Sequence, residues 1–89
     1  MENSEILRKR LILLAERRSM AEMERILGRL LASRLSGWDD EVCQRVIALL
    51  HHSDLDLLDW LAGLKKPEEG VDREVLGWLA EASTGAHSV

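Results

Sequence analysis

The hydrophobic and polar positions of this chain follow a helical period in five successive segments. Within each segment, aliphatic residues recur every three or four positions, which places them along one face of a helix. No stretch of strand length alternates apolar and polar residues, and the abundant Leu, Glu and Arg favour helix. The periodic segments span about residues 4–17, 20–34, 39–51, 53–66 and 71–82. The pattern therefore predicts an all-α protein.

Short polar connections separate the five segments. Connections of this kind favour antiparallel neighbours, so we expect a single compact antiparallel bundle of about five helices. A chain of 89 residues has room for one modest core, which predicts one helical domain over residues 1–89. We expect an ordered core of about 4–82 and a flexible tail, 83–89, because the tail is small and polar.

Cap residues mark several helix starts. Asn3 or Ser4 suits the N-cap of the first helix, because a short side-chain oxygen can accept a bond from a free backbone N–H. Ser19 is followed three positions later by Glu22, which is the capping-box pattern. This spacing predicts that Ser19 caps the second helix and that the chain breaks sharply after the first. Ser53 stands in a similar position before the fourth helix.

The net charge of −4 is unevenly distributed. Residues 1–36 contain eight basic and five acidic side chains, whereas residues 37–89 contain four and eleven. An acidic whole argues against nucleic-acid binding, which needs many cations to neutralise phosphates. The basic first half could meet an acidic partner surface, or it could form ordinary solvated helix faces; the charges alone leave both open.

Cys43 is the only cysteine, so no internal disulfide can form. Its apolar neighbours predict a buried, unreactive thiol, and a reducing cytoplasm is the expected location. No apolar run approaches the roughly 20 residues of a membrane span, and the N-terminal residues lack a signal-peptide pattern. We therefore expect no membrane insertion.

The chain shows no arrangement typical of an enzyme active site. His51 and His52 are adjacent and point about 100° apart on a helix, and neither has a third ligand at metal-binding spacing. Paired carboxylates occur at helix starts or in a loop, where acidic residues are expected for electrostatic reasons. There is no glycine-rich phosphate loop and no nucleophile motif. We expect no catalytic residue, no metal and no enzyme activity.

A polar stripe marks the beginning of the second helix. Arg18, Glu22, Arg25 and Arg29 are spaced four, three and four, which predicts that all of them share one helix face. Guanidinium groups form bidentate bonds with carboxylates and phosphates, so the face suits a protein surface or a nucleotide cofactor. The alternative is a set of common intrahelical pairs worth only about 0.2–0.5 kcal/mol each.

Two motifs carry a resemblance to a known family. The first is a basic pair, a small residue and a glutamate at a helix start, here Arg17-Arg18-Ser19-Met20-Ala21-Glu22. The second is an acidic, leucine-rich turn of helix that ends in Trp-Leu, here residues 54–61, followed by Gly63 and Pro67. In their order and spacing, residues 5–82 resemble the SdhE family of succinate dehydrogenase flavinylation factors.

The resemblance implies a five-helix assembly factor without catalytic residues of its own. Such a factor binds the flavoprotein subunit of succinate dehydrogenase, and by extension of fumarate reductase, and promotes covalent attachment of FAD to a histidine there. It implies no stably bound cofactor, and we expect a monomer. By carry-over, the functional surface contains Arg18, Ser19 and Glu22, with Arg10 and Arg17 beside them. Arg25 joins this set through the polar stripe.

Ser19 departs from the family pattern, which usually has glycine at this position. If the position needs φ > 0, serine is strained; if it is an N-cap, serine is well suited. A second hypothesis is a regulatory or oligomerising helical module, antitoxin-like, with a different protein client. A strong self-dimer would favour that module, whereas a monomer would favour the assembly factor.

Overall fold

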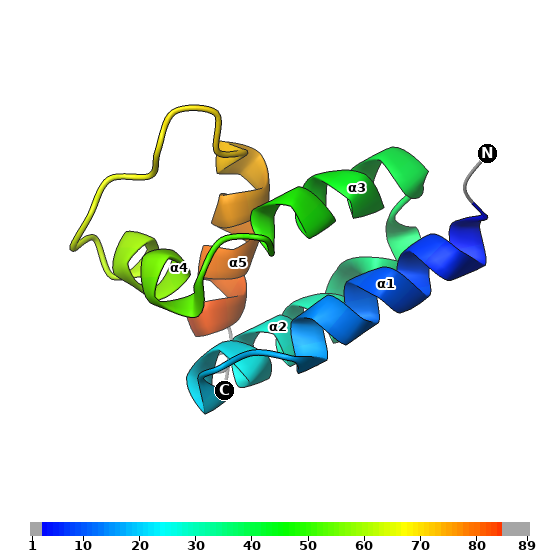
Figure 1. The fold of residues 1–89 in the computed structure, drawn as a ribbon, viewed down its shortest axis with the longest axis horizontal. Coiled ribbons are helices and arrows are strands. Elements are labelled where there is room, and N and C mark those ends of the chain that lie inside the picture. The colour runs from blue at the N-terminus through cyan, green and yellow to red at the C-terminus, as the bar shows by residue number, and fades with distance from the viewer. Residues whose placement is uncertain (1–2, 85–89) are drawn as a thin grey trace.

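Residues 3–84 form five α-helices, and the longest connection between them is the loop of residues 62–72 (Figure 1). The computed structural model describes residues 3–84. In chain order the elements are α1 (Ser4–Glu16), α2 (Ala21–Arg34), the 3-10 turn η1 (Leu35–Gly37), α3 (Asp40–Leu49), α4 (Asp54–Leu61) and α5 (Arg73–Thr84). Residues 3–84 contain no strand, so the all-α prediction is confirmed. Among these residues, no helix combines the length and the apolar character that crossing a membrane requires.

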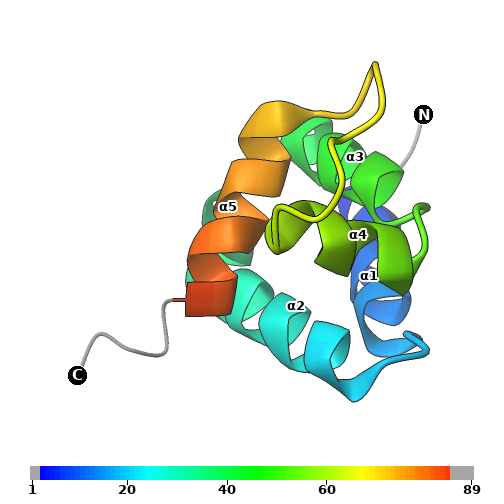
Figure 2. The same cartoon turned by 90° about the vertical axis from the view of Figure 1, so that its left-hand side faces the viewer.

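The first two helices form an antiparallel hairpin, and α3 runs back beside α1 (Figure 1). α5 stands across one end of this layer and packs against α2, α3 and α4 (Figures 1 and 2). The turn between α1 and α2 lies at the same end of the molecule as α4 (Figure 2). Elements far apart in the sequence therefore meet around this turn.

All five helices contribute aliphatic side chains to one core. The chain has no Phe and no Tyr, so Leu, Ile, Val and Met fill most of the interior, together with Trp38 and Trp60. The least exposed core side chains, each at most 2 % exposed, are Leu7, Leu11, Met23, Ile26, Leu27, Leu30, Cys43, Val46, Leu50, Leu57, Val75 and Leu79. A fully buried aliphatic side chain of this size stabilises the fold by about 1.5–3 kcal/mol. Most of these residues recur every three or four positions within their helices, as the predicted helical period requires.

Cys43 is completely buried in α3, as predicted. Burial raises the pKa of its thiol, and the nearby Arg8 charge only partly opposes this effect. A neutral, inaccessible thiol is a poor nucleophile. The residue therefore acts as a small apolar side chain of the core.

Side-chain caps begin several helices. Asn3 accepts a hydrogen bond from the Glu5 amide at 2.7 Å, and Ser53 accepts one from the Asp56 amide at 3.1 Å. Asp39 caps α3 through a backbone amide at 2.9 Å. Each such cap contributes about 1 kcal/mol. The predicted caps at the starts of α1 and α4 are thus confirmed.

α4 is shorter than its apolar period predicts. The helix ends at Leu61, and Gly63 follows with φ of +75°, a left-handed conformation that glycine adopts without strain. The segment predicted to be helical extends to residue 66, and Leu64 continues its apolar period, but Leu64 lies beyond the helix and is 77 % exposed, so this part of the prediction is wrong. Gly63 stops the helix before Pro67 is reached.

α5 begins and ends later than predicted. Asp72 accepts a hydrogen bond from the Val75 amide at 3.1 Å, which fixes the start of the helix at Arg73. Ser83 and Thr84, predicted to belong to the flexible tail, are helical. The rest of that predicted tail lies outside the described residues.

An aromatic and ionic cluster joins η1, α3 and α5. The Trp38 and Trp78 rings are stacked with centroids 5.7 Å apart. The guanidinium carbons of Arg34 and Arg45 lie 5.3 and 5.8 Å from the Trp78 centroid. Arg45 also holds Asp72 through two hydrogen bonds, 2.6 and 3.0 Å long. The cluster fixes the start of α5 against the end of the hairpin.

Candidate functional site

The turn between α1 and α2 is attached to the start of α4. Arg17 follows the last residue of α1, and its side chain is exposed. Arg18 turns inward instead, and its Nε donates to Oδ1 of Asp54 at 2.7 Å. The two side chains are only 7 % and 2 % exposed. The turn and the first residue of α4 are therefore joined by a buried ion pair.

The Arg18 guanidinium also holds three backbone carbonyls. It donates to the carbonyl oxygens of Leu50 at 2.8 Å, His52 at 2.9 Å and Leu14 at 3.3 Å. These oxygens belong to the residue after α3, the loop before α4 and the last turn of α1. A guanidinium is planar and has five N–H donors, so it can bond to several acceptors in different directions at once. A lysine ammonium would not reproduce this arrangement. One side chain thus links three segments of the chain.

The Asp54 carboxylate accepts three hydrogen bonds from the turn. Besides Arg18, the Ser19 hydroxyl donates to Oδ2 at 3.1 Å and the Met20 amide donates to it at 3.0 Å. Burial by itself would raise the pKa of Asp54, but these hydrogen bonds and the Arg18 charge outweigh it and hold the pKa below its usual value. Asp54 is therefore ionised and fully engaged at neutral pH.

The predicted polar stripe is wrong for Arg18. The spacing of four from Arg18 to Glu22 places them on one face only if both residues are helical. α2 begins at Ala21, so Arg18 lies in the turn, and its side chain points into the molecule. Arg18 does not present a free guanidinium on the surface of the helix.

The predicted capping box at Ser19 is also wrong. Met20 is the N-cap of α2, without a side-chain bond to the helix, and Ser19 precedes it. The Ser19 hydroxyl donates to Asp54 and is not available to accept from the helix amides. No residue other than glycine among residues 3–84 has positive φ, so serine is not strained at this position. Ser19 thus serves neither of the two roles considered for it.

Glu22 and Arg25 remain on the surface of α2 as an intrahelical pair. Arg25 Nη2 donates to Glu22 Oε1 at 2.6 Å, and both side chains are more than half exposed. Arg10 and Arg17 are also exposed. Arg29 is half-buried, and its Nε is buried without a hydrogen-bond partner among the described residues. The role of this set in binding a partner stays a prediction.

A shallow hollow of about 310 Å³ lies beside the turn between α1 and α2. Arg17 and Ser19 line it from the turn, and His51 and Ser53 line it from the loop before α4. His52 belongs to the same loop, and its ring meets the Trp60 ring of α4 edge to face, with centroids 5.0 Å apart. The hollow places exposed polar groups of the first motif beside those of the loop that precedes the second motif.

Sequence reasoning did not identify Asp54 as a site residue. Asp54 was noticed only as part of the acidic motif of residues 54–61. An aspartate beside a leucine-rich helix face can be buried together with that face. A buried carboxylate needs a charged or hydrogen-bonding partner, so this position indicates that such a partner exists. The partner itself lies 36 positions away, beyond the reach of any local spacing rule.

The fold and the site define a small, all-helical protein with a charged turn held by a buried ion pair. Residues 9–83 match the family described as flavinator of succinate dehydrogenase. The chain therefore belongs to this family, and the predicted resemblance is confirmed. No curated protein and no solved structure matches the chain.

Proposed function

We propose that this protein binds the flavoprotein subunit of succinate dehydrogenase through the turn between α1 and α2 and promotes covalent attachment of FAD to that subunit. Membership in a family of flavinators supports the assembly role. The binding surface consists of the exposed residues Arg10, Arg17, Ser19, Glu22 and Arg25. The related flavoprotein of fumarate reductase is a second client of the same kind.

The buried pair of Arg18 and Asp54 is the observation that carries this proposal. It fixes the turn against α4, so Arg17 and Ser19 are held in one geometry before a partner arrives. A preorganised surface loses less conformational entropy on binding than a mobile one. Arg18 thus acts as a positioning residue, and its exposed neighbours make the contacts.

The mechanism is differential binding. A helper promotes a reaction in its client when it binds best the conformation in which the reacting groups are aligned. Here FAD and the acceptor histidine belong to the client, and this chain supplies shape and charge. It binds no FAD stably and contributes no catalytic group. It works as a monomer in the cytoplasm.

Charge changes on the exposed first turns of α2, beside the turn between α1 and α2, test the proposal. In cells that lack their own factor, the flavoprotein subunit is co-expressed with wild type, Arg25→Glu, or the exchange Glu22→Arg with Arg25→Glu. The exchange keeps the net charge and the intrahelical ion pair, but it swaps the positions of the positive and the negative side chain on the surface that a partner would contact. Covalent flavin is read by in-gel fluorescence, and capture of the subunit by co-purification. We expect both variants to lose most of the capture and of the fluorescence.

Arg73→Glu is the matched control. Arg73 is exposed at the start of α5, and its reversal changes the net charge as much as Arg25→Glu does. This control should keep full capture and fluorescence. Wild-type flavinylation by the folded exchange variant would exclude this surface. Failure of the wild-type protein to capture the subunit would exclude the client.

A further inference from the structure

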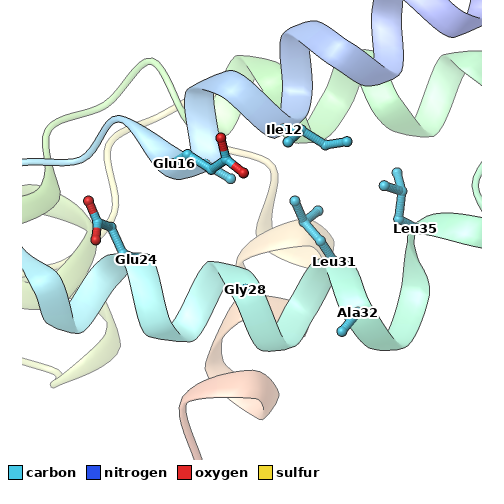
Figure 3. Close-up of a pocket in the computed structure, with 8 residues that line it drawn as sticks. Ile12, Glu16, Glu24, Gly28, Leu31, Ala32 and Leu35 are labelled. Atoms are coloured by element: carbon cyan, nitrogen blue, oxygen red, sulfur yellow. The ribbon is translucent and has the colours of Figure 1, made fainter.

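An apolar groove, separate from the hollow beside the turn, runs along the α1–α2 hairpin (Figure 3). Its volume is about 490 Å³. The groove is lined by Ile12 from α1, by Leu31 from α2 and by Leu35 from η1. The side chains of Ile12 and Leu31 point into the space between the two helices. Ile12 is 36 % exposed, so its apolar surface is only partly covered by the fold.

Gly28 lies in the middle of α2 and opens the groove down to the helix backbone. A Cβ placed on Gly28 would meet no atom within 4 Å, so packing inside this protein does not require glycine there. Glycine in a helix interior lowers helix stability relative to alanine. The open backbone gives another chain room to approach closely.

Two carboxylates close one end of the groove. Glu16 extends from the end of α1 and Glu24 from the first part of α2, and their carboxylates lie on the two sides of the opening (Figure 3). Neither carboxylate has an ion-pair partner among the described residues. Like charges placed this way favour a cation between them. The groove therefore combines an apolar length with an acidic end.

We propose that this groove binds an amphipathic helix of a partner protein, with a Lys or Arg of that helix placed between Glu16 and Glu24. An apolar stripe laid into a groove between helices is a recurring recognition mode. From Glu24 to Leu35 the groove wall is about 16 Å long at 1.5 Å per residue, which matches about three turns of the incoming helix. Gly28 lies under the middle of that helix. The inference does not depend on the identity of the flavoprotein client.

The probe is a synthetic 18-residue helical peptide with leucines at i, i+3, i+4 and i+7 and two arginines at one end. It is titrated into the full-length, isotope-labelled protein, and amide chemical shifts are followed by NMR. We expect the largest shifts along the groove, at Ile12, Glu24, Gly28 and Leu31. Replacing the two arginines of the peptide by glutamates should weaken binding at least tenfold.

Gly28→Gln places a polar side chain in the groove. The added Cβ meets no atom within 4 Å, and glutamine is a good helix former, so the variant should fold. We expect it to weaken peptide binding at least tenfold. The matched control is Gly77→Gln, because Gly77 is likewise an exposed glycine inside a helix, α5, with open space around it. Its affinity should stay within twofold of wild type. Ile12→Gln, which removes an apolar wall, should weaken binding as Gly28→Gln does.

Three results would overturn the inference. One is unchanged binding by Gly28→Gln. Another is a set of shifts centred on Ile6 and Leu13, the exposed apolar residues of α1 outside the groove. The third is self-association: if Gly28→Gln abolishes a dimer seen by sedimentation, the occupant is a second copy of this chain.

Discussion

Arg18 and Asp54 are 36 positions apart in the chain, yet Nε of one lies 2.7 Å from Oδ1 of the other, with both side chains buried. The pair joins the turn after α1 to the first residue of α4. It also joins the two sequence motifs on which the resemblance rests, because Arg18 belongs to one and Asp54 to the other. The ion pair between Arg18 and Asp54 therefore holds the exposed residues Arg17 and Ser19 in place, although neither residue belongs to the pair.

Breaking the Arg18–Asp54 pair should destabilise the protein strongly. Asp54→Asn leaves a buried guanidinium without its counter-charge, and losing one partner of a buried pair costs about 3–5 kcal/mol. Unfolding by urea, followed by circular dichroism, measures the loss. Asp56→Asn on the same helix is the control, because the side chains of its ion pair with Lys65 are 29 % and 49 % exposed and the loss should be far smaller. Equal losses for the two variants would contradict the structural role assigned to Asp54.

The free energy of unfolding should fall in acid. The hydrogen bonds from Arg45 hold the pKa of Asp72 below its usual value, and in Asp54 those from Arg18 and the turn outweigh the upward effect of burial. A carboxyl whose folded pKa is lowered contributes stability above its unfolded pKa of about 3.9 and loses it as the pH falls through the folded pKa. Stability should therefore decrease below about pH 4.

Asp72→Asn isolates one of these groups. Asparagine still caps α5 but cannot carry the charge that pairs with Arg45. Wild type should be more stable than this variant at neutral pH, and the difference should shrink as the pH is lowered below about 4. Urea midpoints across this range test the prediction. A difference that does not change with pH would show that the Asp72 charge makes no net contribution.

Ser19→Gly should destabilise the protein more than Ser19→Ala. Both variants lose the hydroxyl that donates to Asp54, at about 1 kcal/mol. Glycine also gives the unfolded chain more freedom, which adds about 0.4–1 kcal/mol. Because Ser19 does not have positive φ, no strain is released. A glycine variant more stable than the alanine variant would contradict this account. Folded Ser19→Gly should still support flavinylation of the client, because Arg18 and Glu22 remain.

Two glycines should respond oppositely to alanine. Gly28→Ala in α2 should raise the stability by about 0.5–1 kcal/mol, because the position is helical and open. Gly63→Ala should lower it by about 1–2 kcal/mol, because Gly63 has φ of +75°. Thermal melts measure both changes, since 1 kcal/mol shifts the midpoint by about 4–8 °C in a domain of this size. Shifts of the same sign would contradict the assignment of the two conformations.

Much of the fold could be predicted because helical faces depend on neighbours three and four positions away. Leu7 and Leu11 of α1, and Met23 and Leu27 of α2, follow this spacing, and all are buried. Short-range chemistry also marks the cap of α4 at Ser53. Leu64 fits the same apolar period but lies beyond Gly63, whose backbone conformation ends the helix.

The candidate site could be predicted only in part. The motif around Arg18 and Ser19 lies at the turn between α1 and α2, but local spacing predicts an exposed stripe and a capping box there. The stripe requires Arg18 to be part of α2, and the capping box requires α2 to begin directly after Ser19. In the structure α2 begins at Ala21, with Met20 as its N-cap. The packing of α4 against the turn instead supplies Asp54, whose carboxylate takes Arg18, Ser19 and the Met20 amide as donors.

The sequence by itself determined the five helices, most of the core and the family of this protein, because each of these depends on residue types at fixed short spacings. Only the tertiary structure decided that Arg18 is internal, that Ser19 serves Asp54 and that Gly28 opens a groove. The physical reason is that the energy of an ion pair or a hydrogen bond depends on the distance to its partner and on burial. For Arg18 both quantities are set by a residue 36 positions away.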